Sequence, residues 1–282
     1  MSLASAPTVS IIVAVYNGAA TLQQCIDSVA NQTYPNRELI IIDGGSKDGT
    51  LDLLEANRGK IDYLVSEPDR GIYSAWNKGL VKANGEWVCF LGADDYFPDS
   101  RVLERLVETL ERLPPNILVA YARIMALNAD GASLFPVGES WEKLKERFKQ
   151  IMCIPHQGVM HRRKLFERHG MFDESFRIAG DYELLLRELK TADAFFIPDI
   201  IAVAMRKGGI SSRPDNTITM LREIRRAQKT HGQWLPSRLW LATVAKAYLR
   251  LFLWNVLGAR LTRKALDLRR RVKGLPAYWT RT

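Results

Sequence analysis

Cysteine is scarce in this sequence, and it is not arranged for any of the common cysteine sites. The three cysteines, Cys25, Cys89 and Cys153, are scattered through 282 residues without C-x-x-C spacing. This pattern argues against a disulfide framework or a zinc site, and it suits a reducing compartment.

Signals for secretion and membrane insertion are scarce as well. Residues 1–8 lack the basic and apolar regions of a secretory signal. No window reaches the roughly 18 uncharged apolar residues of a simple membrane span, because the nearest candidate, 239–258, contains Lys246 and Arg250. The sequence therefore predicts a cytoplasmic protein without a simple transmembrane helix.

The standard nucleotide-binding loops are also missing. No G-x-G-x-x-G is present, which excludes the usual dinucleotide fingerprint. Gly44 and Gly49 have the spacing of a Walker loop, but Thr50 follows where Lys and Ser/Thr are needed. The same segment does not fit a calcium-binding EF-hand, because Gly45 and Lys47 do not supply the alternating oxygen ligands.

Positive charge is plentiful, with a formal net charge of +9, but it is unevenly distributed. Residues 233–282 contain 11 Lys or Arg and one acid, whereas the first 232 residues contain 29 basic and 30 acidic side chains. The basicity therefore belongs to the C-terminal region. Nucleic acid is not a predicted partner, because the core is neutral and no recognised nucleic-acid module is present.

Strand-like and helix-like segments alternate along the first half of the chain. Buried strands are predicted by β-branched runs at 9–15, 38–43, 61–65 and 87–91, and helices by the periodicity of 19–32, 50–57 and 73–83. This alternation predicts βαβ units and a parallel sheet. We therefore expect an open α/β sandwich over about residues 8–210.

Polar residues follow these strands at their carboxyl ends, where ligands bind in such folds. The first strand ends at 16–18 (YNG), and the second runs into 43–50 (DGGSKDGT). The third leads to Asp69 and the fourth to Asp94 and Asp95. Because carboxylates at one sheet edge repel one another, a cation or hydrogen-bond donors must lie near them.

Asp94 and Asp95 are candidate metal ligands. Adjacent carboxylates suit Mg²⁺ or Mn²⁺, which proteins hold through one or two carboxylates together with substrate phosphates. The alternative is that the pair caps a helix expected near Asp99 and Ser100.

Other polar residues allow both a functional and a structural interpretation. Asp43 ends a hydrophobic strand and can accept hydrogen bonds from a base or a ribose. In the same loop, Ser46 or Asp48 can instead be a helix N-cap, and Asp48-Gly49 a simple turn. Asp181 lies in the first turn of an apolar helix, where an acid favours the helix macrodipole regardless of chemistry.

His156 and the basic segment 206–212 also allow both a functional and a structural interpretation. His156 can assist a metal, a diphosphate or an acceptor, or it can be an ordinary histidine near the core. Arg206 or Lys207 can neutralise a diphosphate from a loop that closes over a donor, or they can form a solvated basic turn.

Taken together, these segments resemble the glycosyltransferases of family 2, which have the GT-A fold. Residues 9–17 (VSIIVAVYN) resemble the family's opening strand, and 43–50 match its D-x-G-S-x-D-G-T loop. Residues 69–79 (DRGIYSAWNKG) resemble the D-x-G-I-Y-D-A-M-N-K-G stretch of a subgroup that builds bacterial exopolysaccharide and glycolipid sugars. Asp94-Asp95 stands in place of the D-x-D-type motif, and Gly180-Asp181 in place of the E-D-type motif.

The resemblance implies a GT-A-type α/β sandwich with a mixed, mainly parallel central sheet over residues 8–215. A helical, basic and amphipathic C-terminal region, 216–282, would be appended to it. The implied reaction is inverting transfer of a sugar from a nucleoside-diphosphate sugar, with a UDP-sugar favoured, to a hydroxyl of a glycan or lipid-linked acceptor. Such a hexosyltransferase-type enzyme (EC 2.4) would act in cell-surface polysaccharide or glycolipid synthesis.

Roles for individual residues follow from the motif match. Asp181 would be the general base and Asp95 the primary metal ligand, while Asp94 would contact the metal or the ribose. Outside the matched motifs, His156 is a candidate to assist the metal. The candidate donor-binding residues are Tyr16, Asn17, Asp43, Gly45, Ser46, Asp69, Lys78 and Asp94, with Tyr16 stacking on the base that Asp43 contacts, together with Arg206 and Lys207 of the basic segment.

Two positions depart from the family pattern. Ala93 stands where the family often has an acid, so the metal site relies on Asp94 and Asp95. Gly180 stands where a Glu often precedes the catalytic Asp, so Asp181 is alone in that motif.

The C-terminal region predicts helices at 217–231 and from Pro236 onward. From 239 to 261 apolar residues cover most of the helical circumference, and a basic cluster follows. Together with Trp240, Tyr248 and Trp254 as interface anchors, this pattern is typical of a helix lying on anionic lipid. We expect peripheral binding to the inner membrane face; the alternative is that the apolar face packs on the catalytic domain or on a second subunit in a homodimer.

Two other functional classes stay open at this point. A sugar-phosphate nucleotidyltransferase would also be an α/β sandwich, but it should carry a Gly-rich, basic loop where 16–20 (YNGAA) stands. A nucleotide-binding module would use the same crevice without turnover.

Overall fold

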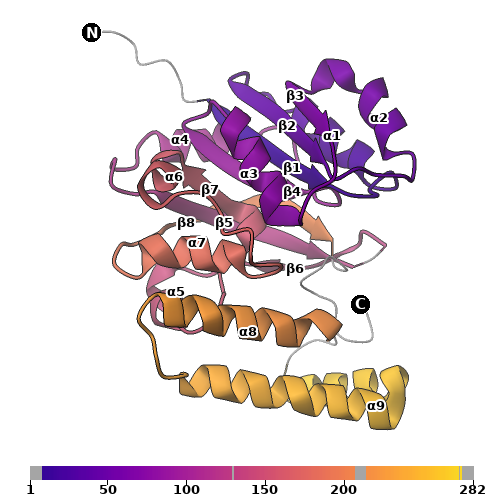
Figure 1. The fold of residues 1–282 in the computed structure, drawn as a ribbon, viewed down its shortest axis with the longest axis vertical. Coiled ribbons are helices and arrows are strands. Elements are labelled where there is room, and N and C mark those ends of the chain that lie inside the picture. Colours follow the sequence, from indigo (N-terminus) through magenta and orange to yellow (C-terminus); the bar gives the residue numbers. More distant parts are fainter. Residues whose placement is uncertain (1–7, 129, 207–213, 273, 275–282) are drawn as a thin grey trace.

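Helices lie on both sides of a central sheet in the computed structural model, which describes residues 8–128, 130–206, 214–272 and 274 (Figure 1). The strands are β1 (Val9–Val15), β2 (Arg37–Asp43), β3 (Tyr63–Ser66), β4 (Trp87–Gly92), β5 (Val119–Leu127), β6 (Ser133–Val137), β7 (Val159–Arg162) and β8 (Phe195–Arg206). The α-helices are α1 (Leu22–Ala30), α2 (Thr50–Ala56), α3 (Ile72–Lys82), α4 (Val102–Leu110), α5 (Trp141–Phe148), α6 (Lys164–His169), α7 (Gly180–Leu189), α8 (Pro214–Thr230) and α9 (Arg238–Val272).

The sheet has the order β3-β2-β1-β4-β7-β5-β6, and β8 pairs with β5. Strands β1 to β4 are mutually parallel, as is the β5–β8 pair, whereas β7 runs antiparallel to β4 and β5. The predicted mixed, mainly parallel sheet is confirmed. The four predicted strands and three predicted helices of the first half are all present.

Each face of the sheet has its own hydrophobic core, because successive residues of a strand point to opposite faces. In β1, Ile11 and Val13 pack with residues of α1 and α4, while Ile12 packs with residues of α3 and α7. The strand is apolar throughout because both of its faces are covered by helices. This three-layer arrangement fixes the loops at the carboxyl ends of β1 to β4 along one edge.

The C-terminal helices are fastened to the sandwich through α8. Ile224 and Ala227 of α8 belong to the core on the α3 and α7 face, and α7, α8 and α9 stack one below the other (Figure 1). The predicted domain boundary between 215 and 216 falls inside α8. On α9, the Trp240 indole donates to the Leu221 carbonyl over 3.1 Å, and Arg250 donates to the Thr217 hydroxyl over 2.8 Å.

The helix expected over 239–261 is present, but it is interrupted at Gly258. This glycine has φ 72° and ψ 168°, which lies outside the helical region and favours a residue without a Cβ. Beyond it, the Thr262 hydroxyl donates to the Leu253 carbonyl over 2.9 Å, so the chain folds back on itself. Across the residues that the structure describes, no helix is both long and apolar enough to span a membrane.

Candidate functional site

The loops after β1 and β2 are joined by hydrogen bonds at the carboxyl edge of the sheet. The Asn17 N–H donates to the Ser46 hydroxyl over 2.7 Å, and the Asn17 side-chain oxygen accepts from the Lys47 N–H over 2.9 Å. Asn17 has φ 52°, a left-handed conformation that Asn tolerates better than most residues. Asn17 and Ser46, both predicted donor-binding residues, thus hold the two loops in register.

Asp43 organises the loop that follows it. Its carboxylate is buried and accepts from the N–H groups of Gly45 and Ser46, both at 3.0 Å, and from the Ser66 hydroxyl at 2.6 Å. The Ser46 hydroxyl donates to its other oxygen. These bonds give Asp43 a structural role in this loop, and its predicted contact with a base stays a prediction.

Tyr16 and Asp69 meet at Gly44. A Cβ placed on Gly44 would lie 2.6 Å from an Asp69 carboxylate oxygen and 3.5 Å from the Tyr16 ring, so a larger residue here would displace the Asp69 carboxylate. The Tyr16 side chain is 65% exposed at the end of β1, where its ring is accessible to a flat ligand such as a base.

Lys78 is engaged with the loop before α3. Its ammonium group pairs with Glu67 at 2.8 Å and donates to the Pro68 carbonyl over 3.3 Å. These contacts hold Lys78 against the loop that contains Asp69, and they partly neutralise its charge.

Asp94 and Asp95 follow β4 at the same edge, and Arg206 at the end of β8 lies against them. Asp95 is buried and accepts from the N–H groups of Gly92 and Arg206 over 3.3 and 3.2 Å. Burial, together with the charge of Asp94, raises the pKa of Asp95 to about 8, and burial also raises the pKa of Asp94. The helix that follows begins at Val102, which excludes the alternative that the pair is its N-cap.

The carboxylate pair fits Mg²⁺ or Mn²⁺. Both groups are disfavoured as bare anions, as their raised pKa values indicate, and a divalent cation would relieve that cost. Within the described ranges, no cluster of three or more His, Cys, Asp or Glu side chains could hold a metal alone. This agrees with the mode in which a metal shares its coordination with substrate phosphates.

His156 does not join Asp94 and Asp95 in a group of three ligands among the described residues, and its assistance to a metal stays a prediction. Its buried ring stacks on Trp76 with 5.1 Å between centroids and lies 5.2 Å from the ring of His161. Burial, with a smaller contribution from His161, holds the pKa of His156 well below its usual value. Burial likewise lowers the pKa of His161 to about 4.

We expect this histidine pair to make the fold sensitive to acid. Below the ordinary histidine pKa of 6.5, both histidines are protonated in the unfolded chain but stay neutral in the folded chain. The free energy of unfolding therefore falls as the pH drops from about 6.5 towards 4. The slope should approach about 1.4 kcal/mol per pH unit for each histidine. Denaturant unfolding at several pH values measures it. His156→Phe keeps a ring in place, so a slope equal to that of the wild type would contradict this account.

Asp181 lies in the first turn of α7, as predicted. One carboxylate oxygen accepts from the Tyr182 N–H over 2.8 Å and from the Tyr73 hydroxyl over 3.3 Å. Burial raises the pKa of Asp181 to about 6, while these hydrogen bonds oppose the rise. A carboxylate with this pKa is ionised at neutral pH and still accepts a proton readily, which is what a general base requires.

Gly180 stands where the family often has a Glu, and the structure gives a steric reason for the glycine. A Cβ at this position would lie 2.8 to 3.0 Å from three atoms of the Tyr73 ring. A Glu at this position would drive away the tyrosine whose hydroxyl reaches Asp181. The missing acid of the motif therefore makes room for Tyr73.

We expect Gly180→Ala to destabilise the fold by about 1–3 kcal/mol, as overpacked sites do, and to lower activity by moving Tyr73. Denaturant unfolding provides the measurement. Gly59→Ala is the matched control, because the described structure has nothing within 4 Å of a Cβ there. Equal stability of the two variants would contradict the steric explanation.

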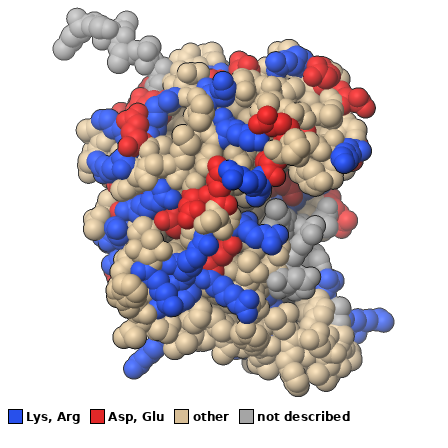
Figure 2. Space-filling view, viewed as in Figure 1, with Lys and Arg blue, Asp and Glu red and all other residues tan. Residues whose placement is uncertain are grey.

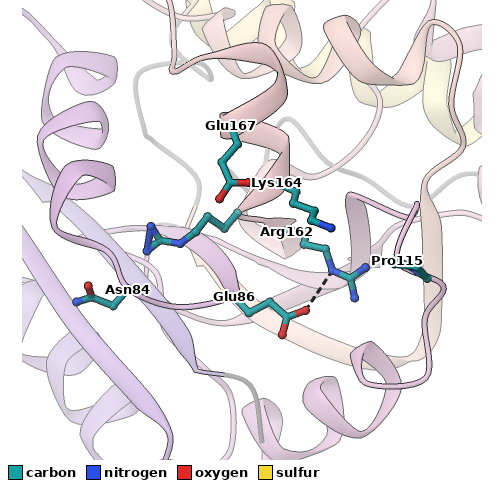
Figure 3. Close-up of a pocket in the computed structure, with 7 residues that line it drawn as sticks. Asn84, Glu86, Pro115, Arg162, Lys164 and Glu167 are labelled. Atoms are coloured by element: carbon teal, nitrogen blue, oxygen red, sulfur yellow. Dashed lines mark ion pairs between the residues drawn. The ribbon is translucent and has the colours of Figure 1, made fainter. Parts of the chain in front are cut away.

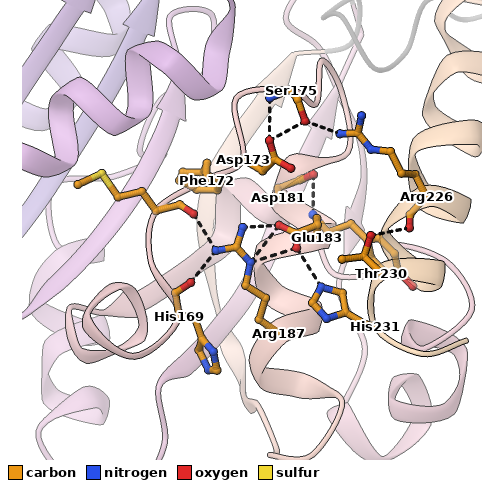
Figure 4. Close-up of polar contacts among 12 residues, drawn as sticks. His169, Phe172, Asp173, Ser175, Asp181, Glu183, Arg187, Arg226, Thr230 and His231 are labelled. Carbon is orange, nitrogen blue, oxygen red and sulfur yellow. Dashed lines mark hydrogen bonds and ion pairs between the residues drawn. The ribbon is translucent and has the colours of Figure 1, made fainter.

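A polar network ties α7 to α8 behind Asp181 (Figure 4). Glu183 pairs with Arg187 at 2.5 Å and with His231, which directly follows α8, at 2.9 Å. Arg226 of α8 donates to the Ser175 hydroxyl over 2.9 Å in the loop before α7. Sequence patterns did not reveal these contacts, since they join residues far apart in the chain.

A hollow lies at the opposite end of β4 from Asp94 and Asp95. A pocket of about 400 Å³ is lined by residues near the amino end of β4 and around α6 (Figure 3). Arg162 pairs there with Glu86 at 3.3 Å and lies over the Trp87 ring at 4.7 Å. Its basic side chain therefore has structural partners, and the predicted site residues lie elsewhere.

The model of glycosyl transferase family 2 matches residues 10–170, which include both loops and the Asp94-Asp95 pair. The chain belongs to this family. As a family 2 glycosyltransferase it is 34% identical over 186 residues to a PGL/p-HBAD biosynthesis glycosyltransferase of Mycobacterium bovis, covering 65% of this chain and 70% of that one. An uncharacterised glycosyltransferase of Rickettsia typhi is 31% identical over 202 residues, 69% of this chain and 63% of that protein.

Solved structures agree on the fold of this family 2 glycosyltransferase. S. aureus TarS 1–349 in complex with UDP-GlcNAc has a TM-score of 0.63 at 18% identity, covering 94% of this chain and 77% of that one. The mannosyltransferase PcManGT from Pyrobaculum calidifontis, in complex with GDP-Man and Mn²⁺, has a TM-score of 0.60 at 21% identity, with coverages of 92% and 74%. The predicted GT-A-type fold is thereby confirmed.

The structure gathers most of the predicted site residues at one edge of the sheet. Tyr16, Asn17, the 43–50 loop, Asp69, Asp94 and Asp95 follow β1 to β4, and Arg206 reaches them from β8. Lys207 lies outside the described residues. Tyr73 lies in the 69–79 motif and reaches Asp181 from α3, a contact that the motif alone does not indicate.

Proposed function

We propose that this glycosyltransferase transfers a sugar, with inversion, from a nucleoside-diphosphate sugar to an acceptor hydroxyl, with Asp181 as the general base. The observation that carries the proposal is the Asp181 carboxylate, which is held by Tyr73 and Tyr182 and has its pKa raised to about 6 by burial. The UDP-GlcNAc and GDP-Man complexes of the two structural neighbours support a nucleotide-sugar donor.

The residues at the sheet edge would bind different parts of the donor. Tyr16 stacks on the base, and the 43–50 loop, with Asp43, Gly45 and Ser46, lies along the nucleoside. Asp69 and Lys78 line the same crevice. Arg206 brings positive charge beside Asp94 and Asp95, where the diphosphate of the donor would lie.

Asp95, with Asp94, would hold Mg²⁺ or Mn²⁺, which supplies positive charge to the departing diphosphate. The Mn²⁺ in the mannosyltransferase complex supports this assignment. On the acceptor side, Asp181 takes the proton from the hydroxyl as that oxygen attacks the anomeric carbon and the bond to the diphosphate breaks. A single displacement of this kind inverts the anomeric centre.

Incubation of the protein with a panel of UDP- and GDP-sugars and Mg²⁺ or Mn²⁺ tests the donor class. We expect metal-dependent binding of one group, with slow release of the nucleoside diphosphate in the absence of acceptor. Consumption of a sugar phosphate and an NTP would instead identify a nucleotidyltransferase. Binding without product, even with acceptor extracts, would identify a binding module.

We further propose that α9 lies on an anionic membrane surface and brings the active site to a polyprenyl- or lipid-linked acceptor at the inner face. One stripe of α9 is apolar and more than half exposed in the isolated chain; its residues are Tyr248 (52%), Leu249 (52%), Phe252 (61%) and Val256 (61%). The area of Figure 2 where α9 lies shows mainly uncharged residues. The exposed basic residues that follow, among them Arg263 and Lys264, complement anionic headgroups.

Co-sedimentation with vesicles tests the membrane face. We expect binding to phosphatidylglycerol-containing vesicles at low salt, weaker binding at high salt, and little binding to phosphatidylcholine alone. Phe252→Glu should abolish binding, whereas Leu51→Glu, at an exposed apolar position on α2, should not. Absence of binding, together with a dimer that Phe252→Glu dissociates, would assign the face to a second copy of the chain.

A further inference from the structure

A side chain from the C-terminal helical region closes the amino end of the helix that carries Asp181. The Glu223 carboxylate on α8 accepts hydrogen bonds from the N–H groups of Arg177, Ile178 and Ala179 over 2.8, 2.9 and 2.9 Å. These three residues directly precede α7. Glu223 itself is only 8% exposed.

The local sequence provides no side-chain cap at this end of α7. An N-cap residue normally uses its own side-chain oxygen to satisfy the free N–H groups of the first turn. Ala179, at the N-cap position of α7, has no such oxygen, and neither does Ile178. The carboxylate of Glu223 instead binds the N–H groups of Ala179 and of the two residues before it, so another helix fixes the chain just ahead of the first turn. The charge makes these hydrogen bonds stronger than neutral ones.

Glu223 is held rigidly in place. Its neighbours Leu221 and Ile224 are each 1% exposed, and Ile224 lies in the same core as residues of α7. On the same helix, the Arg226 guanidinium lies 3.6 Å from the centroid of the Phe176 ring and donates to the Ser175 hydroxyl. The loop 175–179 is therefore fixed to α8 at both ends (Figure 4 shows the Arg226 end).

The position of Asp181 depends on this loop, because only Gly180 separates it from Ala179. Three kinds of group face the Asp181 carboxylate: the Tyr73 hydroxyl from α3, the main-chain N–H groups of α7, and the negative charge of Glu223 from α8. Burial is the main reason that the pKa of Asp181 is raised, and the charge of Glu223 adds to it.

We propose that Glu223 is a positioning residue for Asp181, holding the backbone at 177–179 so that the carboxylate meets the acceptor hydroxyl. The inference rests on the proposed role of Asp181 as the general base. It extends the catalytic machinery into α8, beyond the 10–170 segment that carries the family match. A loss of α8 would then impair the chemical step as well as stability.

Three variants separate geometry from charge. Glu223→Gln keeps one accepting oxygen but removes the charge, and its amide group opposes the N–H donors. We expect kcat to fall about ten- to a hundredfold, as small misplacements of catalytic groups do, with donor KM unchanged. Because a nearby negative charge is lost, the acid limb of the kcat profile should move to lower pH. Glu223→Asp keeps the charge but shortens the reach, so kcat should fall while the limb stays in place.

Glu188→Gln is the matched control, because Glu188 is a buried glutamate of α7 that pairs with His169 at 2.6 Å and does not touch 177–179 in the described structure. If Glu223→Gln and Glu188→Gln change kcat and the pH limb alike, the positioning role is overturned, whatever happens to stability. Asp181→Asn, assayed alongside, distinguishes the two proposals: turnover retained there overturns both, whereas turnover lost there leaves the Glu223 comparison decisive.

Discussion

Asp181→Asn should lower kcat by about 10²- to 10⁴-fold, the range that general-base catalysis supplies. The substitution keeps the size of the side chain and an oxygen that can accept from the Tyr182 N–H, so α7 should be undisturbed. An amide oxygen is far too weak a base to take the acceptor proton. Donor affinity should stay near the wild-type value, because the proposed role of Asp181 is on the acceptor side.

The measurement is turnover with donor and acceptor, paired with donor binding by calorimetry. Asp199→Asn on β8 is the control, because that carboxylate is exposed and outside the proposed site. Retention of more than a few per cent of turnover in Asp181→Asn would remove Asp181 from its role.

The same assignment fixes the pH dependence of the wild type. A general base must be unprotonated, and burial raises the pKa of Asp181 to about 6. Activity should therefore be constant above that value and fall about tenfold per pH unit below it. A kcat profile that is flat down to pH 5 would contradict a base with this pKa.

Asp95→Asn should remove the proposed response of the enzyme to a divalent metal and lower turnover by at least about 10²-fold, on the scale of losing a main electrostatic stabiliser of the transition state. The Asn oxygen can still accept from Arg206 N–H or Gly92 N–H, which limits damage to the loop. What is lost is the charge that, with Asp94, attracts the cation.

Titration of donor binding and turnover with Mn²⁺, and removal of metal with a chelator, measure this effect. Asp99→Asn, an exposed carboxylate further along the same loop, should leave both unchanged. Full wild-type activity after chelation, or an unchanged Mn²⁺ response in Asp95→Asn, would contradict the metal assignment.

The first half of the fold was predictable because its signals are local. The run VSIIVAV is apolar at every position since helices cover both faces of β1, and the loops at 16–18, 43–50 and 94–95 follow their strands directly. Strand β5 was not predicted, although its run VAYARIMAL is also mainly apolar. It pairs in parallel with β8, more than sixty residues later in the chain, and such long-range pairing is not encoded in any short window.

For individual site residues, too, the sequence gives the residue type and only the structure gives its partners. The sequence suggested ligand contacts for Asp43, Lys78 and His156. The structure adds protein partners to each: Asp43 also holds its own loop, Lys78 pairs with Glu67, and His156 is buried among aromatic rings. In each case the residue type allowed a ligand contact, and tertiary neighbours decided which partner it has. Glu223 shows the converse, because nothing around it in the sequence distinguishes it from a solvated helix acid.

The sequence by itself determined the family, the βαβ order and the line of polar residues at the carboxyl ends of four strands, since these depend on local patterns and motif spacing. Only the tertiary structure decided how Asp181 is held and how strongly it binds a proton, because Tyr73, Glu223 and the burial around α7 come from segments far apart in the chain. The C-terminal region is a further example. The sequence shows that its basic residues are concentrated there, but only the packing of α8 on α7 shows that this region also supports the proposed catalytic centre.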